Sequence, residues 1–384
     1  MTAATLPRPA APTKEWSVET ISGDEHFHRL RDEWTDLVAR CAAATPFQSH
    51  AWLASWWRHY GTPGRLRVTL VRHRGRLVGA VALMRERRWF GAVLTPVGGA
   101  LSDFTDVLLD DAAADAAARV LAAALLRLRD WRLIDLPETR AGAMAGRLPG
   151  AWPGRYRRVP ASLCLELPAT PTEELVRDLP GHARKTVRRR LNQIARLGLD
   201  TRAVPAEETP RAVADLVRLH LAQWDGRGGN PEHRRPRFAA HLTDAVRVMV
   251  DAGQAAVLEY RLDDRLVASN LVVLAPQLAG GYLYGAEPGL RDQIDIATLL
   301  VSSTMTLAHA RGCATMSMLR GAEPYKTRWR PQEARSHRVL LARPGSLRAR
   351  AHLAGVLMKH LIKARLPWLR RIRDAARRLT ARRS

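Results

Sequence analysis

The amino-acid sequence predicts an α/β protein made of two similar halves, each with a mixed, mostly antiparallel sheet flanked by helices. The chain has 384 residues, about twice the length of an ordinary domain. Helical and strand-like periodicities recur in the same order in both halves. A composition of 46% hydrophobic and 26% charged residues is that of a globular protein. We expect a flexible leader at 1–15, domains at 16–165 and 166–345, and a basic amphipathic helical tail at 346–384.

In the first half, two helices precede the strands. Ser22 and Glu25 resemble a capping box, and apolar residues at helical spacing predict a helix over about 24–42. The segment FQSHAWLASWWRHYG predicts a second helix with one aromatic face. The runs RVTLVRH and RLVGAVALM predict a β-hairpin with its turn at Arg74 and Gly75. The half is completed by strands at WFGAVLTPVGG, SDFTDVLLD and WRLIDLP and by a helix at 112–129.

The second half repeats this order. A hairpin is predicted from AAVLEYRL and LVASNLVVL, with its turn at Asp263 and Asp264. It is followed by the strand GYLYGAE, a helix at 293–311 and the strands TMSML and HRVLLA. Three helices come before the hairpin, near 172–197, 207–224 and 236–252.

Composition excludes several classes of protein. No apolar run reaches the roughly 18 residues that a membrane-spanning helix needs. The first fourteen residues, MTAATLPRPAAPTK, contain no signal-peptide core, so a cytoplasmic location is expected. Cys41, Cys164 and Cys313 are far apart, which predicts neither a disulfide framework nor a metal site. The net charge of +24 is concentrated at the C-terminus, where residues 343–384 hold thirteen Lys or Arg against one acid.

The tail has the pattern of a basic amphipathic helix. Leu353, Leu357 and Leu361 recur four residues apart with cations between them. This pattern suits an anionic membrane surface, which would make the protein peripheral on the inner face of the membrane. RNA binding and disorder remain open alternatives.

Four segments resemble the tandem acetyltransferase-like proteins of the GNAT superfamily, in the branch called BioF2-like or CelD/BcsL-like, which is related to the FemABX peptidyltransferases. They are FQSHAWLASWWRHYG, HARKTVRRRLNQIARLG, LHLAQWDGRGG and MSMLRGAEPYKTRWRP. The resemblance implies two GNAT-like domains that face each other, with the catalytic cleft mainly in the second. It implies transfer of an acyl or aminoacyl group to a nucleophile without a metal.

Acyl transfer needs a base for the acceptor, donors for the developing oxyanion and an acid for the leaving group. Tyr325 and Lys326 follow a strand and a Gly-Ala-Glu-Pro turn, so their side chains can project at a sheet end. Tyr325 is the expected proton donor, and Lys326 the expected contact to the donor or its phosphates. Glu323 could pair with Lys326 or accept a proton. A solvated basic strand with Tyr325 in the core is the alternative.

Other candidates lie earlier in the second half. His220 titrates near neutrality and could be the base, with Trp224 four residues on along the same helix face. The glycine-rich stretch 226–229 resembles a loop over the cleft. Trp224, Asn270, in an apolar strand, and Arg328 are candidate substrate-binding residues. A packed histidine and a structural asparagine are the plainer interpretations.

The donor site is expected before the last long helix. GNAT enzymes bind the pyrophosphate of acyl-CoA at a glycine-containing turn there, whereas this chain has LRDQIDIATLL. Arg291, Gln293 and Ile294 are therefore the expected cofactor-binding residues, although the β-branched isoleucine should hinder close approach. Acyl-CoA is the expected co-substrate.

The acceptor is expected to be a small molecule, an amino sugar or a nascent cell-envelope polysaccharide. The helix HARKTVRRRLNQIARLG carries six cations and leaves aminoacyl-tRNA open as the donor, although no aromatic residue lies between its arginines. A non-catalytic GNAT-like binding protein is the third hypothesis.

Overall fold

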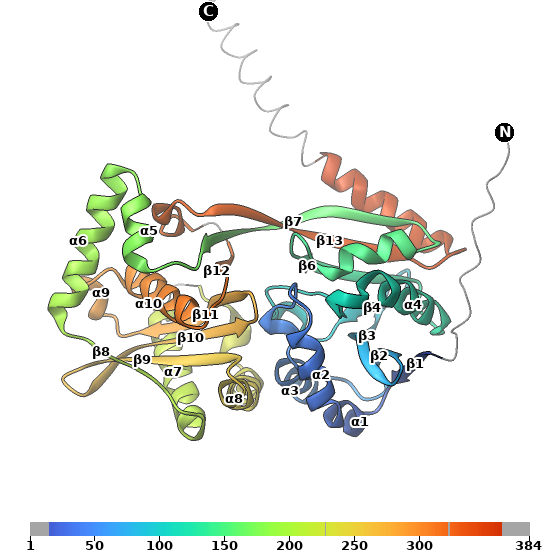
Figure 1. Ribbon diagram of the computed structural model, residues 1–384, viewed down its shortest axis with the longest axis horizontal. Coiled ribbons are helices and arrows are strands. Elements are labelled where there is room, and N and C mark those ends of the chain that lie inside the picture. Colours follow the sequence, from blue (N-terminus) through green and yellow to red (C-terminus); the bar gives the residue numbers. More distant parts are fainter. Residues whose placement is uncertain (1–14, 227, 322, 363–384) are drawn as a thin grey trace, which may run out of the picture.

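The strands of the protein form one continuous sheet that crosses both halves of the molecule (Figure 1). The structure, a computed structural model, describes residues 15–226, 228–321 and 323–362. Within these residues the strand order is β1-β2-β3-β4-β6-β13-β7-β12-β11-β10-β9-β8, and β5 pairs with β3. Only the pairs β4–β6 and β11–β12 are parallel. The predicted mixed, mostly antiparallel α/β architecture is confirmed.

The first half contains the elements from β1 to β7. Its strands are β1 (Trp16–Ile21), β2 (Leu66–His73), β3 (Arg76–Arg88), β4 (Gly91–Pro96), β5 (Leu108–Leu109), β6 (Leu133–Thr139) and β7 (Tyr156–Pro168). Its helices are α1 (Asp24–Arg29), α2 (Arg31–Ala39), α3 (His50–Tyr60) and α4 (Ala114–Arg127).

The second half contains the remaining elements. Its strands are β8 (Asp200–Ala203), β9 (Ala255–Leu262), β10 (Arg265–Ala275), β11 (Leu278–Ala286), β12 (Thr315–Arg320) and β13 (Gln332–Ala342). Its helices are α5 (Thr172–Asp178), α6 (Gly181–Leu197), α7 (Thr209–Trp224), α8 (Pro236–Asp251), α9 (Leu290–Gln293) and α10 (Ile296–Ala310). Residues 347–362 form a further helix.

Local signals explain most element boundaries. Arg74, Gly75, Asp263 and Asp264 all have positive φ, as tight hairpin turns require, so both predicted turns are confirmed. The predicted helix 172–197 is instead two helices, α5 and α6, because Pro180 interrupts it. The predicted helix 24–42 is likewise split, into α1 and α2. The predicted capping box is wrong, since Gly23 is the N-cap of α1 and no side chain caps it.

Strands β7 and β13 belong to both halves. Residues 337–342 of β13 pair with β6, and its whole length pairs with β7, whose last residues pair with β12. Figure 1 shows the two strands running side by side across the molecule. The expected boundary between residues 165 and 166 therefore falls inside a shared strand, and the two halves do not separate there.

A second connection joins the halves on one face of the sheet, where α3 packs against α8. The Trp52 and His241 rings meet edge to face with centroids 4.6 Å apart, and Ser55 Oγ donates to the His241 carbonyl oxygen at 2.9 Å. At the rim, Arg58 and His59 both contact the Asp244 carboxylate at 2.9 Å. The predicted aromatic face of α3 is thus an interface between the halves.

Burial of His241 makes the connection between the halves sensitive to acid. Desolvation lowers the pKa of His241 to about 3, from an ordinary value of 6.5. As the pH falls, His241 is therefore protonated in the unfolded chain before it is protonated in the folded protein. The stability from neutral His241 is complete above pH 6.5 and is lost as the pH falls toward 3, at up to about 1.4 kcal/mol per pH unit. Urea titrations of wild type and His241→Gln between pH 7 and 4 should show a shallower pH dependence in the variant.

The matched control for this prediction is His309→Gln, since His309 is exposed on α10. It should keep the wild-type pH dependence of the free energy of unfolding. Equal slopes for wild type and His241→Gln would contradict a neutral, buried His241.

The helix at 347–362 begins by packing on the first half. Ala349 and Leu353 are buried with Phe90, Val93 and Leu340 in a small separate core. Leu353, predicted to face a membrane, instead contacts the protein and is 2% exposed. The leader up to residue 14 and the rest of the tail, from residue 363, lie outside the described residues. Within the described ranges, no helix has the length and hydropathy needed to cross a membrane.

Candidate functional site

The parallel strands β11 and β12 pair for only three residues and then separate. Their register runs from Leu278 opposite Thr315 to Gly280 opposite Ser317. Beyond this point β12 follows β7, with Arg320 opposite Cys164, while β11 continues along β10. The separation opens the sheet at the carboxyl ends of two parallel strands, where ligands of α/β proteins commonly bind.

A cavity of about 480 Å³ lies at this end of the sheet. It is bordered by β11, by the segment that leads into α10, by α6 and by the turn after β12. Its lining includes Tyr284, Tyr325, Arg189, Arg190, Gln193, Arg291, Asp292, Gln293 and Ile294. All three expected cofactor-binding residues are thus brought together with Tyr325.

Tyr325 is suited to donate a proton in this cavity. Its side chain is half-buried, and burial, with a smaller contribution from the Glu323 carboxylate, raises the pKa of Tyr325 well above its usual range. The phenol therefore stays protonated at neutral pH. Of the four expected catalytic residues, Tyr325 is the one that lines the cavity.

Lys326 points into the protein instead. Its ammonium group donates to the carbonyl oxygens of Arg320 at 3.1 Å and Gly321 at 3.4 Å, and it forms an ion pair with Glu323 at 2.8 Å. The side chain is almost fully buried. Lys326 and Glu323 therefore hold the turn that presents Tyr325, and Lys326 is not among the cavity-lining residues.

His220 lies on the α7 side of β11. Its Nδ1 is 2.7 Å from the Tyr284 carbonyl oxygen, so Nδ1 carries the proton and donates. Its Nε2 then accepts from His233 Nδ1 at 3.0 Å. Desolvation lowers the pKa of His220. Because both ring nitrogens are hydrogen-bonded, the lone pair expected for a general base is already used, and Trp224 packs beside this ring rather than beside Tyr325.

Two of the three expected substrate-binding residues, Asn270 and Arg328, also have structural partners. Asn270 is buried in β10 and donates from Nδ2 to Thr304 Oγ1 of α10 at 3.1 Å. Arg328 donates to both oxygens of Asp295 at 3.1 Å. Neither residue lines the cavity beside Tyr325.

The amino end of α10 is capped by the protein's own carboxylate. Asp295 accepts from the Thr298 backbone N–H at 3.1 Å and from its hydroxyl at 2.6 Å. The same carboxylate pairs with Arg190 at 2.8 Å and with Arg328. The amino end of α10 is therefore already occupied by a carboxylate. An anionic ligand bound there would need nearby arginines to balance its negative charge.

Arg189 and Arg291 can supply the positive charge that an anionic ligand would need at this cavity. Both are exposed at the cavity, and neither has an acidic partner in the part of the chain that the structure describes. Ile294, in contrast, is 3% exposed and belongs to the second core cluster. Most of its β-branched side chain therefore lies in the core, and only a small part reaches the cavity.

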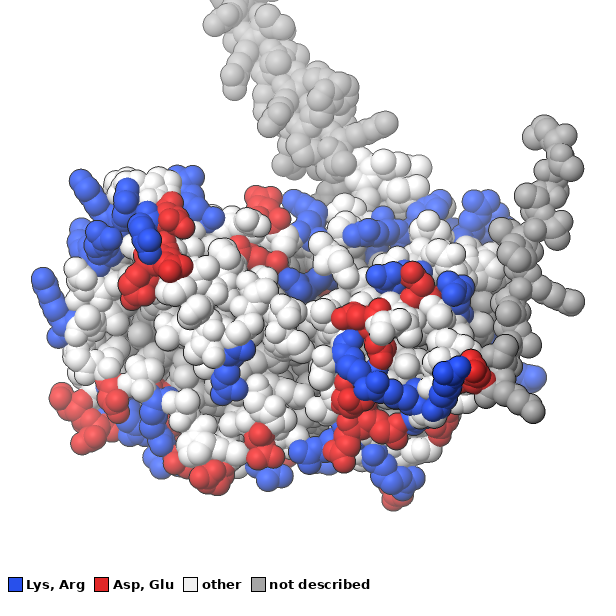
Figure 2. Space-filling view, viewed as in Figure 1, with Lys and Arg blue, Asp and Glu red and all other residues white. Residues whose placement is uncertain are grey.

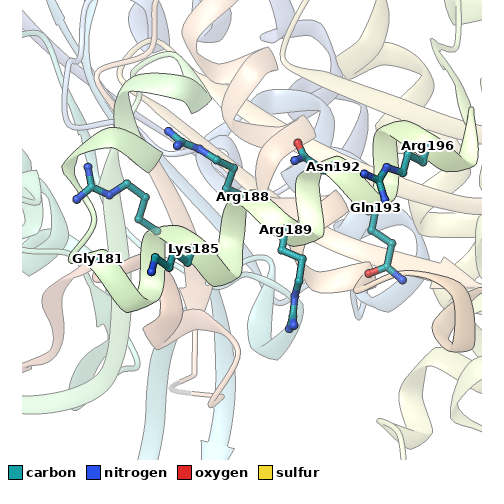
Figure 3. Close-up of a pocket in the computed structure, with 8 residues that line it drawn as sticks. Gly181, Lys185, Arg188, Arg189, Asn192, Gln193 and Arg196 are labelled. Carbon is teal, nitrogen blue, oxygen red and sulfur yellow. The ribbon is translucent and has the colours of Figure 1, made fainter.

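Helix α6 extends the positive charge away from the cavity. Its cationic face is formed by Arg184, Lys185, Arg188, Arg189 and Arg196, and Val187 is its one fully buried residue among those the structure describes. Figure 3 shows these side chains projecting from successive turns of the helix. Figure 2 shows the corresponding blue cluster at the upper left of the molecule. Arg189 and Gln193 border both this surface and the cavity.

Sequence reasoning missed Tyr284, Gln193 and Asp295 as parts of the site. Tyr284 is in the predicted strand GYLYGAE, but a strand pattern does not show which residues face an opening. Asp295 stands directly before the apolar run of α10 and carries an N-cap signal. That signal could have located the helix start, though not its two arginine partners.

Comparison with known proteins identifies the fold of the second half. Residues 181–327 match the acetyltransferase (GNAT) domain family. No curated protein matches the chain. In the described ranges no cluster of His, Cys, Asp or Glu is suited to hold a metal ion.

Solved structures share the fold over most of the chain. FemX is 11% identical with a TM-score of 0.58, covering 84% of this chain and 97% of FemX. The C-terminal domain of a putative lysylphosphatidylglycerol synthetase from Agrobacterium fabrum is 13% identical with a TM-score of 0.53, covering 88% and 98%. A protein of unknown function from Bacteroides thetaiotaomicron is 12% identical with a TM-score of 0.51, covering 82% and 97%.

Proposed function

Because residues 181–327 match the acetyltransferase (GNAT) domain family, we propose that the protein transfers an acyl group from acyl-CoA to an amine or hydroxyl acceptor. The observation that carries the proposal is the cavity where β11 and β12 separate, which combines a protonated phenol with Arg189 and Arg291, neither of which has an acidic partner among the described residues. The acceptor is a small molecule, an amino sugar or a cell-envelope glycan.

The residues suggest how the donor binds. The phosphates of acyl-CoA would contact Arg189 and Arg291, and the thioester would lie in the opening beside Tyr325. The acceptor nitrogen or oxygen attacks the carbonyl carbon, and the carbon–sulfur bond breaks. The departing thiolate takes its proton from the Tyr325 hydroxyl, and the acceptor's proton leaves to solvent.

Aminoacyl-tRNA is the second candidate donor, and the cationic face of α6 favours it. With 17 residues, α6 is about 25 Å long. Its cationic face is therefore longer than the phosphates of one coenzyme A would occupy. An RNA backbone could contact Arg184 and Arg196 together. If tRNA is the donor, ribonuclease should abolish the activity.

The test of the leading donor is thermal stabilisation by acetyl-CoA and longer acyl-CoAs at physiological salt, with ATP as the polyanion control. Salt screens loose binding to a protein of net charge +24. At a hundredfold excess over Kd, a specific ligand stabilises by about 2.7 kcal/mol. We expect acyl-CoA to raise the Tm well above the value with ATP, and an equal shift with both would contradict the proposal.

Replacing Arg291 by alanine should weaken acyl-CoA binding by about tenfold, since one charge-assisted contact is lost. Isothermal titration at physiological salt measures this. Arg211→Ala is the matched control, because Arg211 is exposed on α7 and lies outside the cavity. Equal affinities of the two variants would place the phosphates elsewhere.

A further inference from the structure

The helix at 347–362 is apolar on two opposite faces. One face, with Ala349 and Leu353, is buried against Phe90 and the first half of the sheet. The other face is exposed: Leu347 is 73%, Met358 58%, Leu361 46% and Ile362 54% accessible, and Ala351 and Ala354 between them are also exposed. Residues 347, 351, 354, 358 and 361 follow the spacing of a single helix face. This outer face therefore has no partner among the described residues.

Trp89 is exposed beside the same helix. It stands in the turn between β3 and β4 and is 85% accessible. Its ring centroid is 5.3 Å from that of Phe90, and Phe90 in turn stacks on His352 of the helix at 4.3 Å. A tryptophan with so much exposed surface is typical of a residue that enters a membrane interface.

Cations surround these apolar side chains. Arg348 and Lys359 lie on one flank of the outer helix face and Arg350 on the other, while Arg85 and Arg87 are exposed on β3 just before Trp89. Figure 2 shows mainly blue groups along the upper right of the molecule, in the region that this helix occupies in Figure 1. The neighbouring acids are paired, Asp135 with Arg338 at 2.6 Å and Glu86 with Arg88 at 2.9 Å. The sequence of 363–384 adds nine Lys or Arg and one acid, Asp374.

We propose that Trp89 and the outer face of the helix at 347–362 dock the protein on an anionic lipid bilayer. Leu347, Met358, Leu361 and Trp89 would enter the boundary between headgroups and acyl chains, and the flanking cations would contact lipid phosphates. Nucleic acid would use the same charges, but its polar phosphate backbone would leave most of this apolar helix face exposed to water. The bilayer is therefore the partner that matches both parts of the surface.

The test is sedimentation of the full chain with phosphatidylcholine vesicles, with and without phosphatidylglycerol, at physiological salt. We expect binding to the anionic vesicles only. Met358→Glu should lower the partition coefficient at least about tenfold, because it places a charge in the apolar face. Arg348→Gln should lower it about fivefold, and the charge-matched control Arg211→Gln on α7 should leave it unchanged.

A second measurement identifies the docking residue directly. Brominated phosphatidylcholine in the anionic vesicles should quench the fluorescence of the wild type, and Trp89→Phe should lose part of this quenching. Failure of the wild type to bind anionic vesicles, or equal partitioning of wild type and Met358→Glu, would overturn the proposal. So would binding of RNA that competes fully with vesicles and is unaffected by Met358→Glu.

Discussion

Replacing Tyr325 by phenylalanine should lower kcat by about a hundredfold and leave KM for the acyl donor nearly unchanged. The substitution removes one oxygen atom and keeps the ring, so the cavity retains its shape. The hydroxyl is protonated at neutral pH, as for any tyrosine, and burial raises the pKa of Tyr325 further. Its proton is needed when the thiolate leaves, so the loss should appear in kcat. Steady-state kinetics with a thiol-detecting reagent measures both constants.

The matched control is Tyr156→Phe, which removes an exposed phenol from the start of β7. Its kcat should equal that of the wild type. A Tyr325→Phe enzyme with at least half of the wild-type kcat would show that another group protonates the leaving thiolate. A rise in KM alone would instead assign Tyr325 to donor binding.

Replacing Trp52 by alanine should reduce the free energy of unfolding by about 3–5 kcal/mol. Trp52 is fully buried where the halves meet, and its Nε1 donates to Ser102 Oγ at 2.9 Å. Its ring lies edge to face with His241 and with Tyr282, whose centroid is 5.1 Å away. Removing it leaves a cavity bounded by both halves. Urea unfolding monitored by circular dichroism measures the loss.

Trp89→Ala is the control for this prediction, since it removes the same side chain from an exposed position. We expect its free energy of unfolding to stay within about 0.5 kcal/mol of the wild type. Equal stability of the Trp52→Ala and Trp89→Ala proteins would contradict the view that α3 and α8 hold the halves together.

Much of the fold follows from patterns that a short stretch of sequence contains. The hairpin turns at 74–75 and 263–264 were predicted because few residues tolerate positive φ, and the structure has positive φ at all four positions. The aromatic face of α3 was equally visible from its spacing. Tyr325 of the segment singled out by the resemblance, 321–329, lines the candidate cavity.

Residue chemistry alone did not decide which candidates face the cavity. His220, Lys326 and Asn270 are residue types that enzymes often use in catalysis, yet each has a structural hydrogen bond. The partners of His220 and Asn270, Tyr284 and Thr304, are distant in the sequence, and the partner of Lys326, Arg320, lies six residues before it. In the sequence, Arg189 cannot be distinguished from the other arginines of a basic helix. The packing of α6 brings it to the same cavity as Arg291.

Periodicity and the conformational preferences of single residues are enough to predict the mixed α/β architecture and the tight turns, and composition locates the charge in the tail. Tertiary packing places β13 between β6 and β7, pairs Asp295 with Arg190 and Arg328, and turns Leu353 toward the protein while Met358 faces outward. These features depend on contacts between segments far apart in the chain, and a local pattern is compatible with many such partners.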